Sequence, residues 1–154
     1  MHEAGVFDER VLAAAVLHDT VEDTDTSLDE LRGLFGPEIA HIVSEVTDDK
    51  GLAKEERKKR QITHAREISE AGKLVKMADK LYNLRDLKDS PPVDWSLERC
   101  QIYFRWARMV VEGCRGINEY LDRELDQITN PESCQISFQG SLYPCFTAAT
   151  PTYS

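Results

Sequence analysis

The sequence predicts an all-α protein, a helical bundle followed by an irregular tail. Nearly all of residues 8–126 are predicted to be helical, and in most of this region apolar side chains recur every three or four positions, the spacing of one helix face. No segment of this region shows the apolar–polar alternation of a half-buried strand. A chain of 154 residues suits one domain and can bury a substantial core.

The first two helices are predicted from their apolar content and their boundary signals. Residues 8–23 contain an alanine- and valine-rich run, which is typical of a largely buried helix. Ser27 and Glu30 have the spacing of a capping box, and apolar residues follow at helical intervals. Gly36 suits the end of this helix, and Pro37 suits the first turn of the next.

Three further helical regions follow. One carries Ile39, Ile42, Val43 and Val46 on a single face, and a loop is predicted over 47–51. Residues 54–69 form a highly charged helix with little apolar surface. A buried helix is then marked by Leu74, Met77, Ala78, Leu81 and Leu84, and it ends before Ser90-Pro91-Pro92.

The last part of the chain divides in two. Residues 95–128 form a long helical stretch, with Gly113 and Gly116 placed to bend or interrupt it. Residues 133–154 contain no Asp, Glu, Lys or Arg. We therefore predict a domain over 1–130 and an irregular tail over 131–154 outside the folded unit, or packed on an apolar surface left open elsewhere.

Charge and cysteine content narrow the function class. The net charge of −9 argues against binding nucleic acid or an anionic membrane, but it allows a phosphorylated small molecule. The four cysteines show no zinc-ribbon spacing and favour a reduced, intracellular setting. No apolar run reaches the roughly 20 residues of a membrane span, and the polar N-terminus does not resemble a secretory signal. We expect a cytoplasmic protein, and the oligomeric state stays open.

The densest group of chemically active side chains is His18-Asp19-Thr20-Val21-Glu22-Asp23, directly after the most apolar helix. An imidazole and a carboxylate adjacent in sequence can both reach one divalent ion, and mixed nitrogen and oxygen ligands suit Mn, Zn or Fe. Four acceptor groups in six residues are costly together unless a cation or solvent neutralises them. The alternative is a solvated acidic turn at the end of a helix.

A second signal is Asp79, which interrupts an otherwise apolar helix face, with Asn83 one turn later. A buried carboxylate needs a partner. A metal ion would supply one, and an ion pair with Arg85 or a lysine would serve equally well.

Together these segments resemble the RelA/SpoT-type hydrolase domain of the HD-domain family, in its small, single-domain animal form. The resemblance rests on VLHDTVEDTDTSLDEL, EVTDDKGLAKEERKKRQ and KLVKMADKLYNLRDL, and it covers residues 2–128. It implies an all-α bundle that binds Mn²⁺ and hydrolyses the 3′-pyrophosphate of ppGpp, and animal-type members could also act on NADPH.

The motif match also implies roles for single residues. His18, Asp19 and Asp79 would be metal ligands, and Glu22 and Asp23 would act beside the metal in catalysis. The remaining candidates would contact the substrate: Lys54, Asn83, Arg99 and Tyr103. For Tyr103, a plain core position is a rival interpretation. The other basic residues of 54–69 are expected to be mostly solvated.

The sequence departs from the family pattern at both ends. The family has two helices upstream of residue 2, including a His-Pro pair whose histidine is another ligand, and nothing here matches it. His64 is a weak candidate to replace it, and His41 is interpreted as a surface residue. The resemblance therefore implies an N-terminally truncated domain with three of four ligands and weakened activity. Two alternatives stay open, an inactive helical form that binds nucleotide or a partner protein, and a 5′-nucleotidase.

Overall fold

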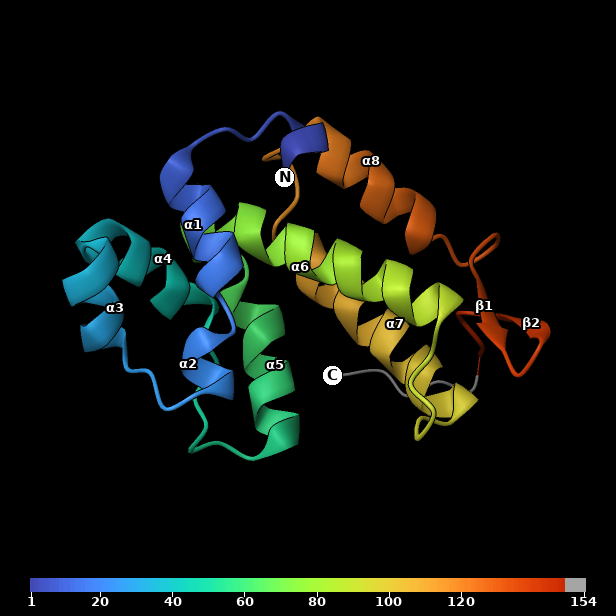
Figure 1. Cartoon of the computed structure of the whole chain (residues 1–154). Helices are drawn as coiled ribbons and strands as arrows, with labels where there is room; N and C mark the ends of the chain where they lie inside the picture. The colour runs from blue at the N-terminus through green and yellow to red at the C-terminus, as the bar shows by residue number, and fades with distance from the viewer. Residues whose placement is uncertain (149–154) are drawn as a thin grey trace.

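The computed structural model describes residues 1–148, which form helices and one small sheet (Figure 1). The elements in order are η1 (His2–Ala4), α1 (Glu9–Leu17), α2 (Thr20–Asp23), α3 (Leu28–Phe35), α4 (Pro37–Val46), α5 (Lys54–His64), α6 (Glu70–Asp89), α7 (Leu97–Glu112), α8 (Glu119–Ile128), β1 (Gln135–Phe138) and β2 (Ser141–Pro144). The expected all-α fold is confirmed, with the β1–β2 hairpin as an addition. None of the helices in this part of the chain has the length and apolar character to cross a membrane.

Local signals fix the helix boundaries as the sequence predicts. The Ser27 backbone N–H donates to Glu30 Oε2 at 2.7 Å, and the Glu30 N–H donates to Ser27 Oγ at 3.2 Å, so the capping box at α3 forms. Gly36 has φ 89° between α3 and α4, a conformation that glycine adopts without steric cost, and Pro37 begins α4. The Gly116 turn, φ 85°, separates α7 from α8.

Two predicted helices are shorter in the structure. The helix expected over 8–23 divides into α1 and α2 at His18 and Asp19, which cap the two pieces. The charged helix expected over 54–69 ends at His64, and α6 starts after the Ser69 cap. The first break has a functional consequence, because it turns both side chains of the His-Asp pair toward α6.

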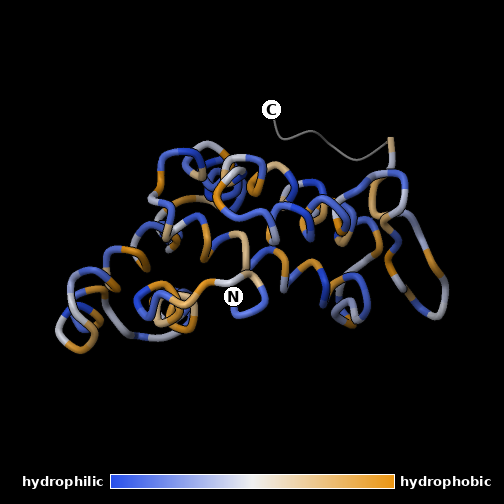
Figure 2. The backbone as a smooth tube through the Cα atoms, turned by 90° about the horizontal axis from the view of Figure 1, so that it is seen from above, coloured by the Kyte–Doolittle hydropathy of each residue, from blue (hydrophilic) through white to orange (hydrophobic). Residues whose placement is uncertain are grey.

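Helix α6 lies at the centre and packs against α1, α4, α7, α8 and β1 (Figure 1). Figure 2 shows hydrophobic and hydrophilic residues alternating along the helical turns, the pattern that the sequence periodicity predicts. Met77 and Leu84 of α6 and Phe104 of α7 are fully buried. This core packs around α6 and determines which of its polar residues face the neighbouring helices.

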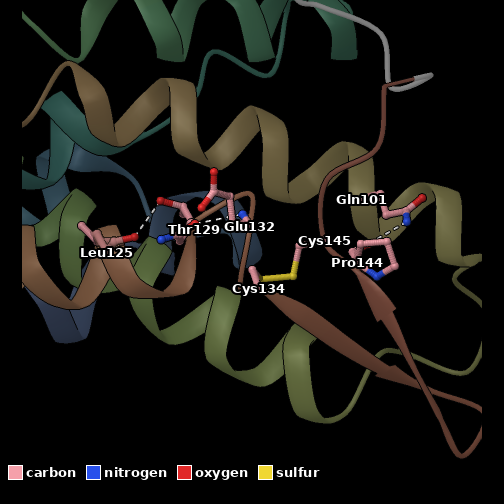
Figure 3. Close-up of a disulfide and its surroundings, with 8 residues drawn as sticks. Gln101, Leu125, Thr129, Glu132, Cys134, Pro144 and Cys145 are labelled. Atoms are coloured by element: carbon pink, nitrogen blue, oxygen red, sulfur yellow. Dashed lines mark hydrogen bonds between the residues drawn. A yellow bond between two sulfur atoms is a disulfide. The ribbon is translucent and has the colours of Figure 1, made fainter.

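The C-terminal segment packs on the helices, which is the second of the two arrangements considered from the sequence. Ile136 on β1 is fully buried, and the Phe146 ring contacts Phe104 edge to face with 6.2 Å between centroids. The Gln101 amide donates to the Pro144 carbonyl at 2.8 Å (Figure 3). Residues 149–154 of the predicted tail lie outside the described residues. Apolar side chains drive this docking, because the segment has no charged residue to keep it in water.

A disulfide joins Cys134 and Cys145 at the open end of the hairpin, with their Cα atoms 5.4 Å apart (Figure 3). The expectation of four reduced cysteines is wrong for this pair. Sequence spacing carried no sign of it, because the pairing of β1 with β2 is what brings the two residues together. Cys100 and Cys114 are free and buried.

Candidate metal centre and nucleotide site

His18, Asp19 and Asp79 converge at the junction of α1, α2 and α6. The His18 Nε2 atom lies 3.0 Å from Asp19 Oδ2 and 3.2 Å from Asp79 Oδ1. One ligand atom from each of the three side chains lies within 4.8 Å of the others. An imidazole nitrogen with two carboxylate oxygens is a donor set that divalent first-row metals accept.

The orientation of His18 is fixed by its second ring nitrogen. Nδ1 lies 2.8 Å from the carbonyl oxygen of Ala15. Because a carbonyl can only accept a hydrogen bond, Nδ1 is the protonated nitrogen, and in the neutral ring the Nε2 lone pair faces the two carboxylates. Metal-binding histidines are commonly oriented by such a second bond.

Asp79 has protein partners as well as a place in the cluster. It accepts a hydrogen bond from Lys80 Nζ at 2.6 Å and another from Asn83 Nδ2 at 2.8 Å. The ion pair considered from the sequence is therefore present with Lys80, whereas Arg85 pairs with Glu124 at 2.6 Å. These bonds hold the carboxylate in one orientation, and they leave Oδ1 shared between His18 and Asn83.

Hydrogen bonds, neighbouring charges and burial shift the pKa values of all three residues of the cluster. The hydrogen bond to Asp79 is the main cause that raises the pKa of His18 to about 8. Burial acts to raise the pKa of Asp79, but hydrogen bonds and charge from His18 and Lys80 outweigh it and hold that pKa well below its usual range. Burial raises the pKa of Asp19. A proton on His18 thus occupies the position that a metal cation would take.

Glu22 and Asp23 differ in position. Glu22 lines a cavity of ≈ 70 Å³ together with the three clustered residues, and its Oε1 accepts a hydrogen bond from the Asp48 N–H at 2.7 Å. Burial raises the pKa of Glu22. Asp23 is exposed and is not among the residues that line this cavity. Of the two, Glu22 alone is within the enclosed space.

Three polar residues of this region, Asp48, Gln61 and Lys76, were not predicted from the sequence to belong to the site. Gln61 on α5 donates through Nε2 to both carboxylate oxygens of Asp48 at 2.8 Å, and Lys76 Nζ donates to Gln61 Oε1 at 3.4 Å. Gln61 was hidden in a charged helix that was expected to be solvated. Lys76 had a usable signal, because it interrupts the apolar face of α6 one turn before Asp79.

A larger cavity of ≈ 770 Å³ lies beside the cluster, between α5 and α7. It is lined by Lys54, Arg99 and Tyr103, three of the four residues expected to contact substrate. The Arg99 guanidinium lies 4.1 Å from the Trp95 ring centroid, so an aromatic and basic wall faces the space. Tyr103 is half-buried and lines this cavity, so it is not a plain core residue, and burial raises the pKa of its hydroxyl.

Asn83 contacts the cluster through Asp79 but does not line the ≈ 770 Å³ cavity, and His41 and His64 lie outside both. Asn83 lines a neighbouring cavity of ≈ 270 Å³ with Tyr103 and Trp95. His64 Nδ1 lies 3.1 Å from Glu67 Oε2, and His41 Nε2 lies 3.6 Å from Glu45 Oε1. Within residues 1–148, neither histidine belongs to the cluster, so neither replaces the fourth ligand there.

Comparison with known proteins identifies the family of this fold. Residues 1–108 match a family described as HD domain. The chain belongs to the HD-domain family. HD-domain hydrolases depend on a metal ion, and within residues 1–148 the cluster of His18, Asp19 and Asp79 could hold one.

Relatives within the family share most of the chain. It is 55% identical over 127 residues to guanosine-3′,5′-bis(diphosphate) 3′-pyrophosphohydrolase MESH1 of Xenopus tropicalis, spanning 82% of this chain and 71% of the relative. The human protein of the same name is 54% identical with the same coverage. A solved structure described as a metazoan ortholog of SpoT that hydrolyses ppGpp superposes with a TM-score of 0.82 at 50% identity, over 85% of this chain and 74% of that one.

Proposed function

We propose that this chain is a metal-dependent hydrolase that removes the 3′-pyrophosphate from guanosine 3′,5′-bis(diphosphate). The observation that carries the proposal is the meeting of His18, Asp19 and Asp79 beside a basic and aromatic cavity. The likeness to the MESH1 proteins, which are named for this activity, supports the substrate. The domain responsible is assigned to residues 1–130.

The metal ligands in this proposal are His18 Nε2 and the carboxylates of Asp19 and Asp79. Mn²⁺ suits a mixed imidazole and carboxylate set of this kind. A divalent ion here supplies a Lewis acid, which offsets charge on phosphoryl oxygens and makes a nearby water more acidic. Lys80 and Asn83 hold Asp79 in its ligating orientation.

Glu22 is the proposed general base. Its carboxylate is enclosed beside the ligands, and its raised pKa makes it a better proton acceptor than an ordinary glutamate. It takes a proton from the attacking water as the water oxygen bonds to the phosphorus attached to the 3′ oxygen. The bond from that phosphorus to the 3′ oxygen breaks, the 3′ oxygen gains a proton, and GDP and pyrophosphate are the products. Asp23 contributes negative charge from the exposed side.

Lys54, Arg99 and Tyr103 are proposed to hold the nucleotide. Arg99 is oriented by its contact with Trp95, so its charge points to a fixed place in the cavity. Guanidinium and ammonium groups bind phosphate, and an aromatic side chain can stack on a base. Asn83 acts through Asp79 in this arrangement.

A cytoplasmic location is part of the proposal, since a nucleotide substrate is available there and Cys100 and Cys114 are free thiols. The Cys134–Cys145 disulfide argues in the other direction, because disulfides are rare in the cytosol. Cell fractionation shows where the protein is located, and thiol alkylation shows whether Cys134 and Cys145 are oxidised there.

The test is pyrophosphate release from ppGpp by purified protein, with and without Mn²⁺, alongside Asp79→Ala. Manganese-dependent release that Asp79→Ala abolishes supports the proposal. A folded protein that releases no pyrophosphate at any manganese concentration overturns it and favours an inactive nucleotide- or partner-binding form. NADPH in the same assay tests a phosphomonoester as second substrate.

A further inference from the structure

A further cavity adjoins the metal cluster and also borders the ≈ 770 Å³ cavity between α5 and α7, the nucleotide cavity of the proposal above. It measures ≈ 230 Å³ and lies between α4 and α5. It shares Gln61 and Lys76 with the small cavity of the cluster, so the two spaces meet at these side chains. Arg57 and Arg60 of α5 add two guanidinium groups to its wall.

Within residues 1–148, Lys76 is a buried cation without a counter-ion. The residue is only 7% exposed. Among the described residues, its one hydrogen bond is the long contact of 3.4 Å to the neutral amide oxygen of Gln61. Burial lowers the pKa of Lys76 and the charge of Lys80 lowers it further, and together these effects outweigh the charges of Asp48 and Asp79, which act to raise it. A buried, unpaired charge is costly, and an anion entering the cavity would offset that cost.

Arg57 gives a second, independent sign of an anion site. Its Nε atom is buried and has no hydrogen-bond partner within the described part of the chain. Buried guanidinium nitrogens without a partner are unusual, because the desolvated N–H loses its bond to water. Arg57 lines both this cavity and the nucleotide cavity, at the point where they meet.

Glu45, Asp48 and Asp49 in the same wall keep their negative charge, but within residues 1–148 none of them forms an ion pair with Lys76 or Arg57, and their oxygens accept hydrogen bonds from other groups. Glu45 accepts from Ser69, Asp48 from Gln61, and Asp49 from Gly51. Arg60 is exposed and has a loose ion pair with Asp49 at 3.6 Å. Lys76 and Arg57 are therefore the cationic groups left to bind a ligand.

The reaction requires a place for a second phosphate. If the nucleoside lies between α5 and α7 and the phosphorus under attack lies at the cluster, the terminal phosphate must extend in another direction. The cavity on the α1–α6 side is lined by Ala15, Val75 and Ala78 together with His18, Asp79 and Tyr82, a set without lysine or arginine. The cavity of Lys76 and Arg57 is the basic one.

We propose that the cavity lined by Lys76, Arg57 and Arg60 is the subsite for the terminal phosphate of the 3′-diphosphate and for the pyrophosphate product. The identity of the anion rests on the proposed function, whereas the presence of an anion site rests on the cavity alone. The Lys76 ammonium lies where this cavity meets the small cavity of the metal cluster, and it binds the terminal phosphate.

Inorganic pyrophosphate is the probe, titrated by calorimetry into protein treated with a chelator, so that the metal cluster does not contribute. Wild-type protein should bind pyrophosphate. Lys76→Met and Arg57→Met should each weaken binding by about tenfold or more, because each removes a charge-assisted bond. Lys59→Met is the matched control, since Lys59 is exposed on the same helix as Arg57 and lines none of the three cavities; its affinity should not change.

The ratio of kcat/KM for two substrates distinguishes loss of this subsite from a general loss of structure. Lys76→Met should lower kcat/KM for ppGpp about tenfold more than kcat/KM for guanosine 3′-monophosphate, which has no terminal phosphate. A general loss of structure would lower both values alike. Absence of pyrophosphate binding by the wild type, unchanged binding in both Lys76→Met and Arg57→Met, or an unchanged ratio overturns the subsite.

The two proposals fail separately. Hydrolysis of ppGpp without pyrophosphate binding overturns the subsite and leaves the enzymatic function standing. Binding of pyrophosphate that depends on Lys76, in a protein that hydrolyses nothing, supports the anion site and overturns the function.

Discussion

His18 Nε2 and Asp79 Oδ1 lie 3.2 Å apart although 61 positions separate the two residues in the sequence. One caps the end of α1, and the other lies in the middle of α6. The packing of α1 on α6 therefore creates the cluster, and anything that separates these helices removes it. We therefore expect metal affinity to be lost whenever the packing of α1 on α6 is lost.

Loss of Asp79 should remove metal binding. Asp79→Ala deletes one of the three proposed ligands and leaves the His18 ring without its main anionic partner, so we expect Mn²⁺ affinity to fall at least about 100-fold and hydrolysis to stop. Metal content after dialysis measures this directly. Asp89→Ala on the same helix changes an exposed residue outside the cluster and should retain the metal. Equal metal content in both variants would contradict the assigned ligands.

Metal binding should be coupled to proton release. His18 has a pKa of about 8 in the metal-free protein, and Nε2 must lose its proton to bind a cation. Apparent Mn²⁺ affinity should therefore fall by about tenfold per pH unit below 8. Calorimetry in two buffers of different ionisation enthalpy counts the released protons. An affinity that stays constant between about pH 6 and 8 would rule out this coupling.

The same group should make the metal-free protein more stable at lower pH. The pKa of His18 in the folded state is raised above its ordinary value of 6.5. Its pairing with Asp79 thus stabilises the fold fully below about pH 6.5, and this contribution is lost as the pH rises through 8. Denaturant unfolding in the presence of a chelator should show the decrease, and His18→Gln should abolish it. A wild-type midpoint that rises over this interval would have the wrong sign.

Glu22 and Asp23 should differ as catalysts. Glu22→Gln removes the proposed general base, and we expect kcat to fall by about 10²–10³-fold with metal content retained. Asp23 is exposed, so Asp23→Asn should lower kcat by less than about tenfold. Steady-state kinetics of the two variants, each saturated with metal, makes the comparison. The opposite order would make Asp23 the base.

The hairpin disulfide should contribute to stability. Replacing Cys134 and Cys145 by serine opens a loop whose ends are 11 positions apart, and we expect the free energy of unfolding to fall by about 2–3 kcal/mol. Urea denaturation with and without a reductant measures it. The double variant should lose its sensitivity to reductant, and a wild-type protein that is equally stable in both conditions would show that the bond is not formed.

Two glycines should respond in opposite ways to alanine. A Cβ at Gly113 would lie 2.8 Å from Ala65 Cβ and 3.2 Å from the Arg66 backbone nitrogen, so Gly113→Ala should destabilise the fold by about 1–3 kcal/mol. A Cβ at Gly33, in α3, would have nothing within 4 Å, and Gly33→Ala should stabilise the fold by about 0.5–1 kcal/mol. Thermal unfolding of both variants tests the close contact between α7 and the α5–α6 connection.

Much of the candidate site was within reach of the sequence. The capping box of Ser27, the Gly36-Pro37 boundary and the apolar period of α6 are local signals, and they acted locally as expected. His18, Asp19 and Asp79 were singled out as candidate ligands because they lie in the two segments that resemble the family's motifs, VLHDTVEDTDTSLDEL and KLVKMADKLYNLRDL. Gln61 and Lys76 were not predicted from the sequence, because their role depends on neighbours from other helices and loops.

The helices, their caps and the identity of the side chains with metal-binding chemistry followed from the sequence, because these depend on residues within one or two turns of each other. Only the packed fold established that Glu22 is enclosed and Asp23 exposed, that Lys76 has no counter-ion among residues 1–148, and that Cys134 bonds to Cys145. Burial and pairing are properties of the space between elements. They arise only when distant segments pack together, and that packing sets the charge and reactivity of each group.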